Sequence, residues 1–234
     1  MKVMNARRNW HGLAQVVAVV ATVNVGISVA DAPVARAEPS KAIRIVAFGD
    51  SLTAGYGLSP RHAFPAQLQK VLKSRGHNVV IANAGVSGDT TTAGLERLAW
   101  AVPDGTDAVI VEFGGNDALR GIDPEVTRAN LEKIISNLKE RNIPTLLAGI
   151  RAPANWGDSY AKTFDAIFPA LAQEHGLVFY QFFLEGVVLN PKLNLNDGLH
   201  PNAKGIAEIV KRIVPSIEDL IDRASTQRAS AARD

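Results

Sequence analysis

The sequence predicts an α/β fold, a three-layer αβα sandwich around a flavodoxin-like, five-stranded parallel sheet. Three observations support this prediction. Short apolar runs rich in branched residues alternate with longer segments of helical periodicity along most of the chain. The runs are nearly continuous in apolar character, which is typical of parallel strands that helices cover on both faces. Glycines or prolines stand at several junctions between the two kinds of segment.

Five of the apolar runs are short enough to be strands. Each contains several residues that favour extended structure, and the first and third runs stop at glycines, Gly49 and Gly114. The expected strands are Ile43–Phe48, Val79–Ala82, Ala108–Phe113, Thr145–Ile150 and Leu177–Phe183.

The segments between these runs place their apolar residues on one helical face. In the first of them, Phe64 and Leu68 are followed by Val71 and Leu72, which is the spacing of a buried helical stripe. The expected helices are His62–Arg75, Thr90–Ala101, Pro124–Arg141, a segment from about Tyr160 that ends at Gly176, and Ala203–Leu220.

The N-terminal region has the three parts of a secretory signal peptide. Lys2, Arg7 and Arg8 precede an apolar stretch, and small residues flank Arg36 before Glu38. A membrane anchor is the competing interpretation, but the stretch is only weakly apolar. We therefore expect residues 1–37 to be removed and the mature protein to be periplasmic or secreted. The export route, Sec or twin-arginine, stays open.

The remaining chain is expected to form one domain over residues 38–223 and a flexible tail over residues 224–234, because the tail is small and polar. Residues 1–37 hold four of the 25 basic residues and one of the 23 acidic ones, so the remainder carries a net charge of −1. This balance argues against a nucleic-acid partner. We expect a monomer with no stable membrane insertion.

The chain contains no cysteine. A cysteine nucleophile, a cysteine-ligated zinc site and disulfide bonds are therefore excluded. The histidines are scattered along the sequence and no carboxylate cluster replaces them, so we expect no metal site.

Polar clusters follow three of the expected strands, and a fourth cluster precedes the last helix. In parallel sheets ligands bind beyond the carboxyl ends of the strands, so these distant segments should converge on one rim. The clusters are Gly49-Asp50-Ser51, Ser87-Gly88-Asp89, Gly115-Asn116-Asp117 and Asp197-Gly198-Leu199-His200.

Ser51 and His200 have the chemistry of a nucleophile and its base. A serine hydroxyl attacks only when a base takes its proton, and Asp197, three residues before His200, can orient the imidazole. Each signal also has a local structural interpretation. Ser51 could simply cap a helix, and the Asp197 carboxylate could form an Asx turn at a helix start.

Acyl transfer also needs donors for a developing oxyanion. The N–H of Gly88 can approach a ligand closely because glycine has no side chain, and Asn116 offers a side-chain amide. In isolation, an asparagine after two glycines usually indicates a turn.

Four blocks in this order resemble those of the SGNH, or GDSL-type, hydrolases. The resemblance covers residues 42–220 and is closest to the bacterial periplasmic branch of multifunctional thioesterase I, arylesterase and lysophospholipase L1. The blocks are Gly49-Asp50-Ser51-Leu52, residues 83–90 with Gly88, Gly114-Gly115-Asn116-Asp117, and Asp197-Gly198-Leu199-His200-Pro201-Asn202.

The resemblance implies the SGNH hydrolase fold and a serine esterase that forms an acyl-enzyme and needs no cofactor. It implies that Ser51 is the nucleophile, that His200 is the general base and then acid, and that Asp197 orients His200. The N–H groups of Ser51 and Gly88 and the side chain of Asn116 would form the oxyanion hole.

The implied substrates are small-molecule carboxylic esters or thioesters, such as aryl esters, acyl thioesters and lysophospholipids. Leu119, Ala152 and Pro153 are the candidate substrate-binding residues, and Ala152 is smaller than the residue that the family tends to carry. Asp50 is expected to be structural. A carbohydrate or peptidoglycan O-acetylesterase on the same fold is the alternative. A binding module without catalysis should have lost one of the key residues, and a nucleotide-binding protein should have a phosphate-binding glycine loop.

Overall fold

The structure is a computed structural model that describes residues 41–231. The expected signal peptide, residues 1–37, and the last three residues, 232–234, lie outside this range. Within residues 41–231, no helix combines the length and the apolar character that crossing a membrane requires.

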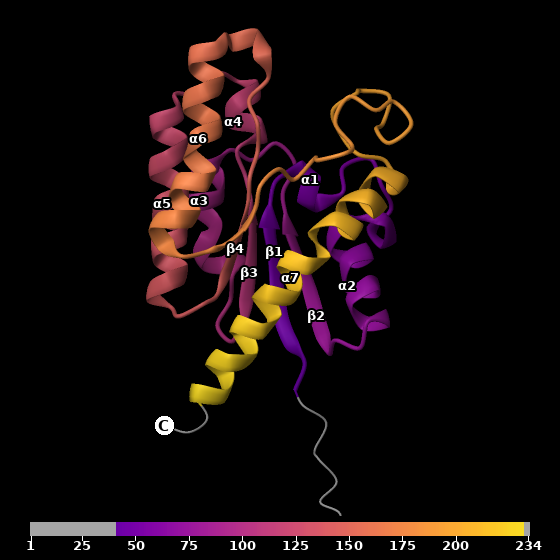
Figure 1. Cartoon of the computed structure of the whole chain (residues 1–234), viewed down its shortest axis with the longest axis vertical. Coiled ribbons are helices and arrows are strands. Elements are labelled where there is room, and N and C mark those ends of the chain that lie inside the picture. Colours follow the sequence, from indigo (N-terminus) through magenta and orange to yellow (C-terminus); the bar gives the residue numbers. More distant parts are fainter. Residues whose placement is uncertain (1–40, 232–234) are drawn as a thin grey trace, which may run out of the picture. The chain divides into compact units, whose positions relative to one another are not determined.

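Five parallel strands form the central sheet (Figure 1). They are β1 (Ile43–Gly49), β2 (Val79–Gly85), β3 (Ala108–Glu112), β4 (Thr145–Ala148) and β5 (Val178–Tyr180). Their order across the sheet is β2-β1-β3-β4-β5, and every neighbouring pair is parallel. This order is the flavodoxin-like one, so the predicted fold class is confirmed. The order reverses between β1 and β3, and ligands in such sheets bind at that point.

Helices cover the two faces of the sheet (Figure 1). On one face, α7 (Ala203–Ala231) crosses four strands and packs against α2 (Phe64–Ser74). On the other face, α5 (Pro124–Glu140) packs between α3 (Thr91–Ala101) and α6 (Asp158–His175). These three layers are the expected sandwich.

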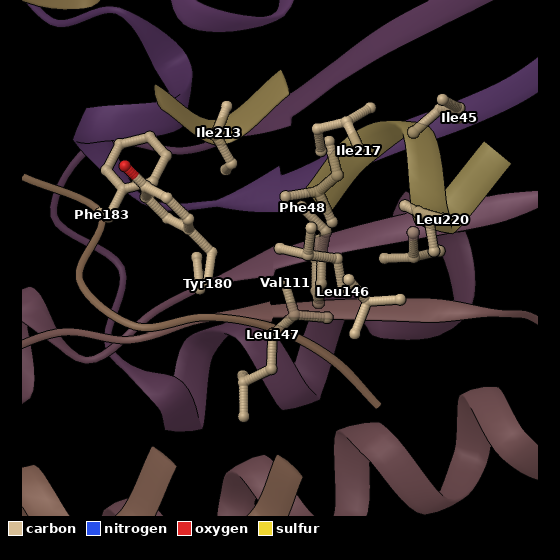
Figure 2. Close-up of a cluster of buried hydrophobic side chains, with 14 of the residues drawn as sticks. Ile45, Phe48, Val111, Leu146, Leu147, Tyr180, Phe183, Ile213, Ile217 and Leu220 are labelled. Carbon is tan, nitrogen blue, oxygen red and sulfur yellow. The ribbon is translucent and has the colours of Figure 1, made fainter. Parts of the chain in front are cut away.

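The core is a continuous cluster of apolar side chains on both faces of the sheet. The strand register aligns Ala47, Ile110 and Leu146 in one row, and all three are buried. The next row, Phe48, Val111 and Leu147, points to the opposite face. Figure 2 shows part of the cluster, to which α7 contributes Ile213, Ile217 and Leu220.

Two single-turn helices follow strands directly, α1 (Ser51–Ala54) after β1 and α4 (Gly115–Leu119) after β3. They were not predicted, because one turn is too short to show a periodic pattern. Two 3₁₀ turns, η1 (Pro60–His62) and η2 (Ala154–Trp156), complete the described elements. The helix expected from His62 therefore starts at Phe64, after η1.

β5 is shorter than the sequence predicts. Beyond Tyr180 the chain leaves the sheet ladder, and Gly149 N–H donates to Tyr180 O while Phe183 N–H donates to Gly149 O. Phe183 is fully buried although it lies outside the strand. The apolar residues after Tyr180 therefore indicate burial in the core and not membership of a strand.

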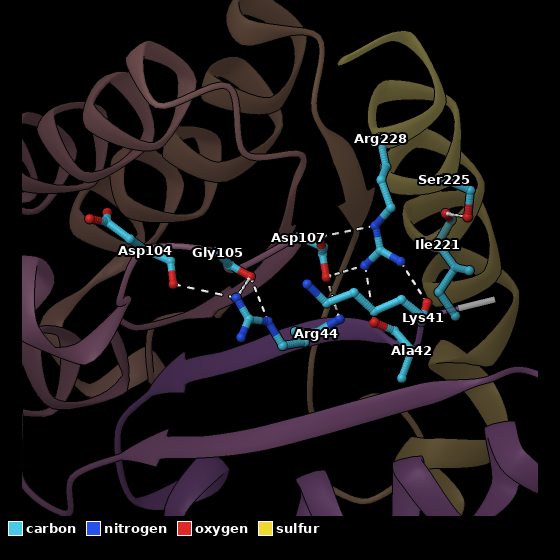
Figure 3. A network of polar contacts seen from close by, with 9 residues as sticks. All are labelled: Lys41, Ala42, Arg44, Asp104, Gly105, Asp107, Ile221, Ser225 and Arg228. Carbon is cyan, nitrogen blue, oxygen red and sulfur yellow. Dashed lines mark hydrogen bonds and ion pairs between the residues drawn. The ribbon is translucent and has the colours of Figure 1, made fainter. Parts of the chain in front are cut away.

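The last helix continues past the expected end at Leu220 and reaches Ala231. Ala224 is buried against the core, and the Arg228 guanidinium donates to Lys41 O, Ala42 O and the Asp107 carboxylate (Figure 3). Residues 224–231 are thus helical, which corrects the expectation of a tail from residue 224. Small polar residues look like a frayed end in sequence, but here the side chains of Gln227 and Arg228 bind partners far away in the chain.

Candidate active site

Ser51 is the first residue of α1, directly beyond the carboxyl end of β1. Asp50 caps this turn, because its Oδ1 accepts the Leu52 N–H at 3.0 Å. Gly49 is required before it: a Cβ at that position would lie 2.2 Å from Thr53 Oγ1 and 2.5 Å from Glu112 O. The nucleophile turn therefore packs too closely against β3 for any side chain at residue 49. Ser51 itself is not the capping residue, so the local structural interpretation of this serine is wrong.

A chain of hydrogen bonds joins the three predicted catalytic residues. Ser51 Oγ lies 2.9 Å from His200 Nε2, and His200 Nδ1 lies 2.7 Å from Asp197 Oδ2. The two histidine nitrogens thus have different partners, as a general base between a nucleophile and an orienting carboxylate requires. The segment between β5 and α7 carries His200 over to α1 (Figure 1), although 149 positions separate His200 from Ser51.

Asp197 also organises its own loop. Its Oδ1 accepts the N–H groups of Leu199 at 2.9 Å and His200 at 3.0 Å, so the Asx turn exists together with the contact to the ring. The backbone hydrogen bond from His200, together with the ring contact, lowers the pKa of Asp197 to about 2. This carboxylate is therefore charged whenever the imidazole needs an acceptor.

The loop after β2 is held at three points beside Ser51. Gly88 has a φ of +90°, which favours glycine, and its carbonyl accepts from Arg120 Nη2 at 2.8 Å. The next carbonyl, Asp89 O, accepts from Asn116 Nδ2 at 2.9 Å. The Asp89 carboxylate pairs with Arg97 Nε at 2.6 Å. These bonds fix the orientation of the peptide groups around Gly88.

Arg97 connects this loop to the nucleophile strand. Its guanidinium is buried, and Nη2 donates to Gly49 O at 2.8 Å while Nε binds Asp89. The charge also lies over the ring of Phe48, 4.6 Å from the centroid. Sequence reasoning missed this residue, because an arginine on an amphipathic helix reads as a surface charge.

Asn116 lies on α4, beyond the end of β3, and faces the same rim. Its Nδ2 donates to Asp50 Oδ2 at 3.1 Å and to Asp89 O at 2.9 Å. A primary amide has two hydrogens, so both have protein acceptors in this structure. Donation to an oxyanion requires that one of these bonds be shared or exchanged. Asp50 is structural, as expected, since it holds both the α1 turn and Asn116.

Two buried carboxyl groups lie under the nucleophile turn. Burial raises the pKa of Asp50 to about 6, against the lowering effect of the Leu52 and Asn116 hydrogen bonds. Burial, with repulsion from Asp50, raises the pKa of Glu112 well above its usual value. Glu112 Oε2 accepts from Thr53 Oγ1 at 2.7 Å, but Oε1 is buried without a hydrogen-bond partner. Sequence reasoning did not identify Glu112 because it ends an apolar strand.

The predicted substrate-binding residues lie on two neighbouring segments. Leu119 ends α4 and is half exposed, while Ala152 and Pro153 are part-buried in the loop after β4. Trp156 joins the segments, because its Nε1 donates to Ala118 O at 2.7 Å. Their role in binding substrate stays a prediction.

One group among the described residues could hold a metal ion geometrically: ligand atoms of Glu132, Glu174 and His175 lie within 4.8 Å of one another. Glu174 is already paired with Arg128 at 2.7 Å, and both glutamates are exposed. None of the three is a residue of the rim described above, so the chemistry of Ser51 does not involve them.

Comparison with known proteins gives consistent matches. A profile of the GDSL-like lipase/acylhydrolase family matches residues 47–207. An arylesterase of Vibrio mimicus is 39% identical over 171 residues, which are 71% of this chain and 86% of the relative. The thioesterase 1/protease 1/lysophospholipase L1 of Escherichia coli strain K12 is 38% identical over 182 residues, covering 77% of this chain and 86% of the relative.

A solved structure agrees with these relatives. The SGNH-hydrolase family esterase AlinE4 has a TM-score of 0.66 and 45% identity, and the match covers 78% of this chain and 98% of AlinE4. The family match includes Ser51, Gly88, Asn116, Asp197 and His200, and it confirms the resemblance that the four sequence blocks carried. The chain belongs to the GDSL-like lipase/acylhydrolase family.

Proposed function

We propose that Ser51, His200 and Asp197 are the catalytic residues of this ester-hydrolysing enzyme and that it acts through an acyl-enzyme. The observation that carries the proposal is the continuous contact from Ser51 Oγ through both imidazole nitrogens to the Asp197 carboxylate. Ester hydrolysis itself follows from membership of the family and from the esterases among the relatives.

The reaction has two acyl-transfer steps. In the first, Ser51 Oγ attacks the substrate carbonyl while His200 Nε2 takes its proton, and the proton then passes to the leaving alcohol or thiol. In the second, His200 deprotonates a water that attacks the acyl-enzyme, and Ser51 recovers its proton. The negative Asp197 stabilises the imidazolium that forms in both steps.

The N–H groups of Ser51 and Gly88 and the Asn116 amide are the proposed oxyanion donors. Asn116 lies beside the loop after β2 and can donate to the oxyanion when one of its two present hydrogen bonds is exchanged. The role of Gly88 is supported by the three hydrogen bonds that hold this loop in place. A preorganised donor favours the transition state because it does not have to reorient when charge develops on the carbonyl oxygen.

The proposed substrates are aryl esters, acyl thioesters and lysophospholipids, with Leu119, Ala152 and Pro153 along the acyl-binding surface. Support comes from the arylesterase and thioesterase/lysophospholipase relatives and from half-exposed apolar side chains near the rim, among them Leu119, Trp156 and Leu199. A panel of p-nitrophenyl esters from acetate to palmitate, with an acyl thioester, a lysophospholipid and an acetylated sugar, tests this specificity. Activity confined to the acetylated sugar would instead identify the O-acetylesterase alternative.

Covalent labelling tests the nucleophile. A fluorophosphonate probe should attach once to the protein, and Ser51→Ala should abolish both labelling and esterase activity because no other group can form the acyl-enzyme. Ser159→Ala, at an exposed serine on α6, is the matched control and should label like the parent. Labelling that persists in Ser51→Ala would remove Ser51 from the mechanism.

We also propose export to the periplasm or the medium as a monomer. The positive, apolar and small-residue segments of residues 1–37 support export. The intact mass of the exported protein should correspond to a chain that starts near Glu38, whereas full-length chain recovered with the membrane would support an anchor.

A further inference from the structure

Tyr56 lies in the turn that follows the nucleophile helix. Its N–H donates to Ser51 O at 3.1 Å, so its backbone is tied to the nucleophile residue itself. Its side chain is 50% exposed, which places the residue outside the core. Core packing therefore does not account for an aromatic residue at this position.

The ring of Tyr56 lies against the imidazole of His200. The two ring centroids are 4.4 Å apart, and the planes are tilted by 35°. The same turn also touches the loop that carries His200, because a Cβ at Gly57 would lie only 2.7 Å from Leu195 Cδ1. The turn 55–57 thus bridges the segment of the nucleophile and the segment of the base.

The contact with Tyr56 restrains His200 in a direction that its hydrogen bonds do not. Ser51 and Asp197 hold the two nitrogens in the plane of the ring, whereas Tyr56 covers one face. An aromatic face attracts a cation within about 6 Å of its centroid, and it attracts a neutral ring less strongly. The imidazole becomes a cation only when it has taken the Ser51 proton, so the contact strengthens as the reaction proceeds.

We propose that Tyr56 is a positioning residue for His200, whose ring face holds the imidazole toward Ser51 and stabilises the imidazolium formed during catalysis. This inference rests on the proposed role of His200 as the base. The phenol oxygen takes no part in this contact. Phenylalanine at this position should therefore position and stabilise the imidazole as tyrosine does, and leucine should not.

Other charged groups that face His200 stay in place in these variants. Among the described residues they are Asp197 on the same loop and Asp50 at the start of α1. Both carboxylates favour the imidazolium while they are charged, and Asp50, with a pKa of about 6, takes up its proton within the acidic limb in every variant. A change between Phe and Leu at residue 56 leaves both carboxylates as they are, so a difference between the two variants reports the aromatic face.

The experiment compares the parent, Tyr56→Phe and Tyr56→Leu with p-nitrophenyl acetate, whose short acyl group limits contact with residue 56. In Tyr56→Leu, kcat should fall by about two- to five-fold with KM nearly unchanged, and the acidic limb of kcat/KM should move about 0.3–0.7 pH units lower. Tyr56→Phe should keep the parental values. All three proteins should melt alike, because the side chain is half exposed.

NMR titration of the imidazole in the same three resting proteins gives a readout that does not need catalysis. The His200 signal, identified by its loss in His200→Gln, should titrate at lower pH in Tyr56→Leu than in the parent and Tyr56→Phe. An unshifted titration and acidic limb in Tyr56→Leu would overturn the inference while Ser51 labelling still supported the proposed function. An effect on KM alone would also overturn it, by making Tyr56 a substrate contact. A protein without Ser51 labelling fails the proposed function instead.

Discussion

The polar networks at the two ends of the sheet differ in how their carboxyl groups are paired. At the amino ends of the strands, the Asp107 carboxylate accepts from Arg44 N–H at 2.7 Å and from the Arg228 guanidinium, and Arg44 Nε donates to Gly105 O at 2.6 Å (Figure 3). At the carboxyl ends, Asp50 and Glu112 are buried together, and no lysine or arginine among the described residues forms an ion pair with either.

The network at the amino ends stabilises the fold, whereas the network at the carboxyl ends surrounds the candidate catalytic residues. The network around Asp107 pairs opposite charges and ties the end of α7 to the start of β1, which favours the folded state. The rim instead keeps acceptors near the nucleophile turn and Asn116, and burying two carboxyl groups there without a basic partner lowers the unfolding free energy. Unfavourable local features such as these buried carboxyl groups occur at functional sites, where the stability of the surrounding fold offsets their cost.

The largest effect should come from Asn116, at the functional end. Asn116→Ala should lower kcat by about 10²–10³, equivalent to about 2.7–4 kcal/mol, with little change in KM, because the oxyanion forms only in the transition state. Asn116→Asp should be at least as damaging, since it would put a carboxylate where Nδ2 now lies 3.1 Å from Asp50 Oδ2. Steady-state kinetics and melting curves of both variants distinguish a role in the transition state from a structural role. A near-normal kcat in Asn116→Ala would leave this residue with only a structural role.

The cost of the buried carboxyl pair should be visible in the pH dependence of stability. Both pKa values are raised by burial, so the folded state binds protons more tightly than the unfolded chain. The unfolding free energy should therefore rise as the pH falls from about 6 to 4, the window between the folded Asp50 value and the unfolded one. Below about pH 4 it should fall again, as Asp197 and Glu218, with pKa values lowered to about 2, take up protons.

Glu112→Gln should relieve part of that cost. At pH 7 the unfolding free energy should increase, and its dependence on pH should become flatter. Urea denaturation at several pH values measures both quantities. Glu140→Gln, at an exposed position that ends α5, makes the same chemical change without burial and should behave like the parent. A Glu112→Gln protein that is less stable at pH 7 would contradict the cost assigned to this carboxyl.

The smallest effect should come from the amino end of the sheet. Arg228→Met keeps the aliphatic stem but removes the bonds to Lys41 O, Ala42 O and Asp107, and should lower the unfolding free energy by about 1–2 kcal/mol. The activity of the folded protein should not change. Arg212→Met, which breaks an exposed pair with Glu208, should cost less than about 0.5 kcal/mol. A loss of kcat in Arg228→Met would show that the two ends are coupled.

Much of the fold was predictable from the sequence because its signals are local. Each strand except the shortened β5 lies close to its apolar run, and the Asp197–His200 contact spans only three residues, which one Asx turn accommodates. The single turns α1 and α4 gave no periodic signal, and the end of α7 looked like a tail because its partners are far away in sequence.

The sequence by itself determined the type and order of the main elements and the candidates for nucleophile, base and oxyanion donors, since those depend on periodicity and on short motifs. Only the tertiary structure decided which side chains surround them. Arg97 reaches Gly49 O across 48 positions, and Tyr56 meets His200 only because β1 and the loop before α7 end at the same rim. The fold also buries Glu112, an ordinary acidic residue in the sequence, under the nucleophile turn and leaves its Oε1 without a hydrogen-bond partner. Charge, burial and ring contact depend on what the folded chain brings together, and no local pattern encodes that.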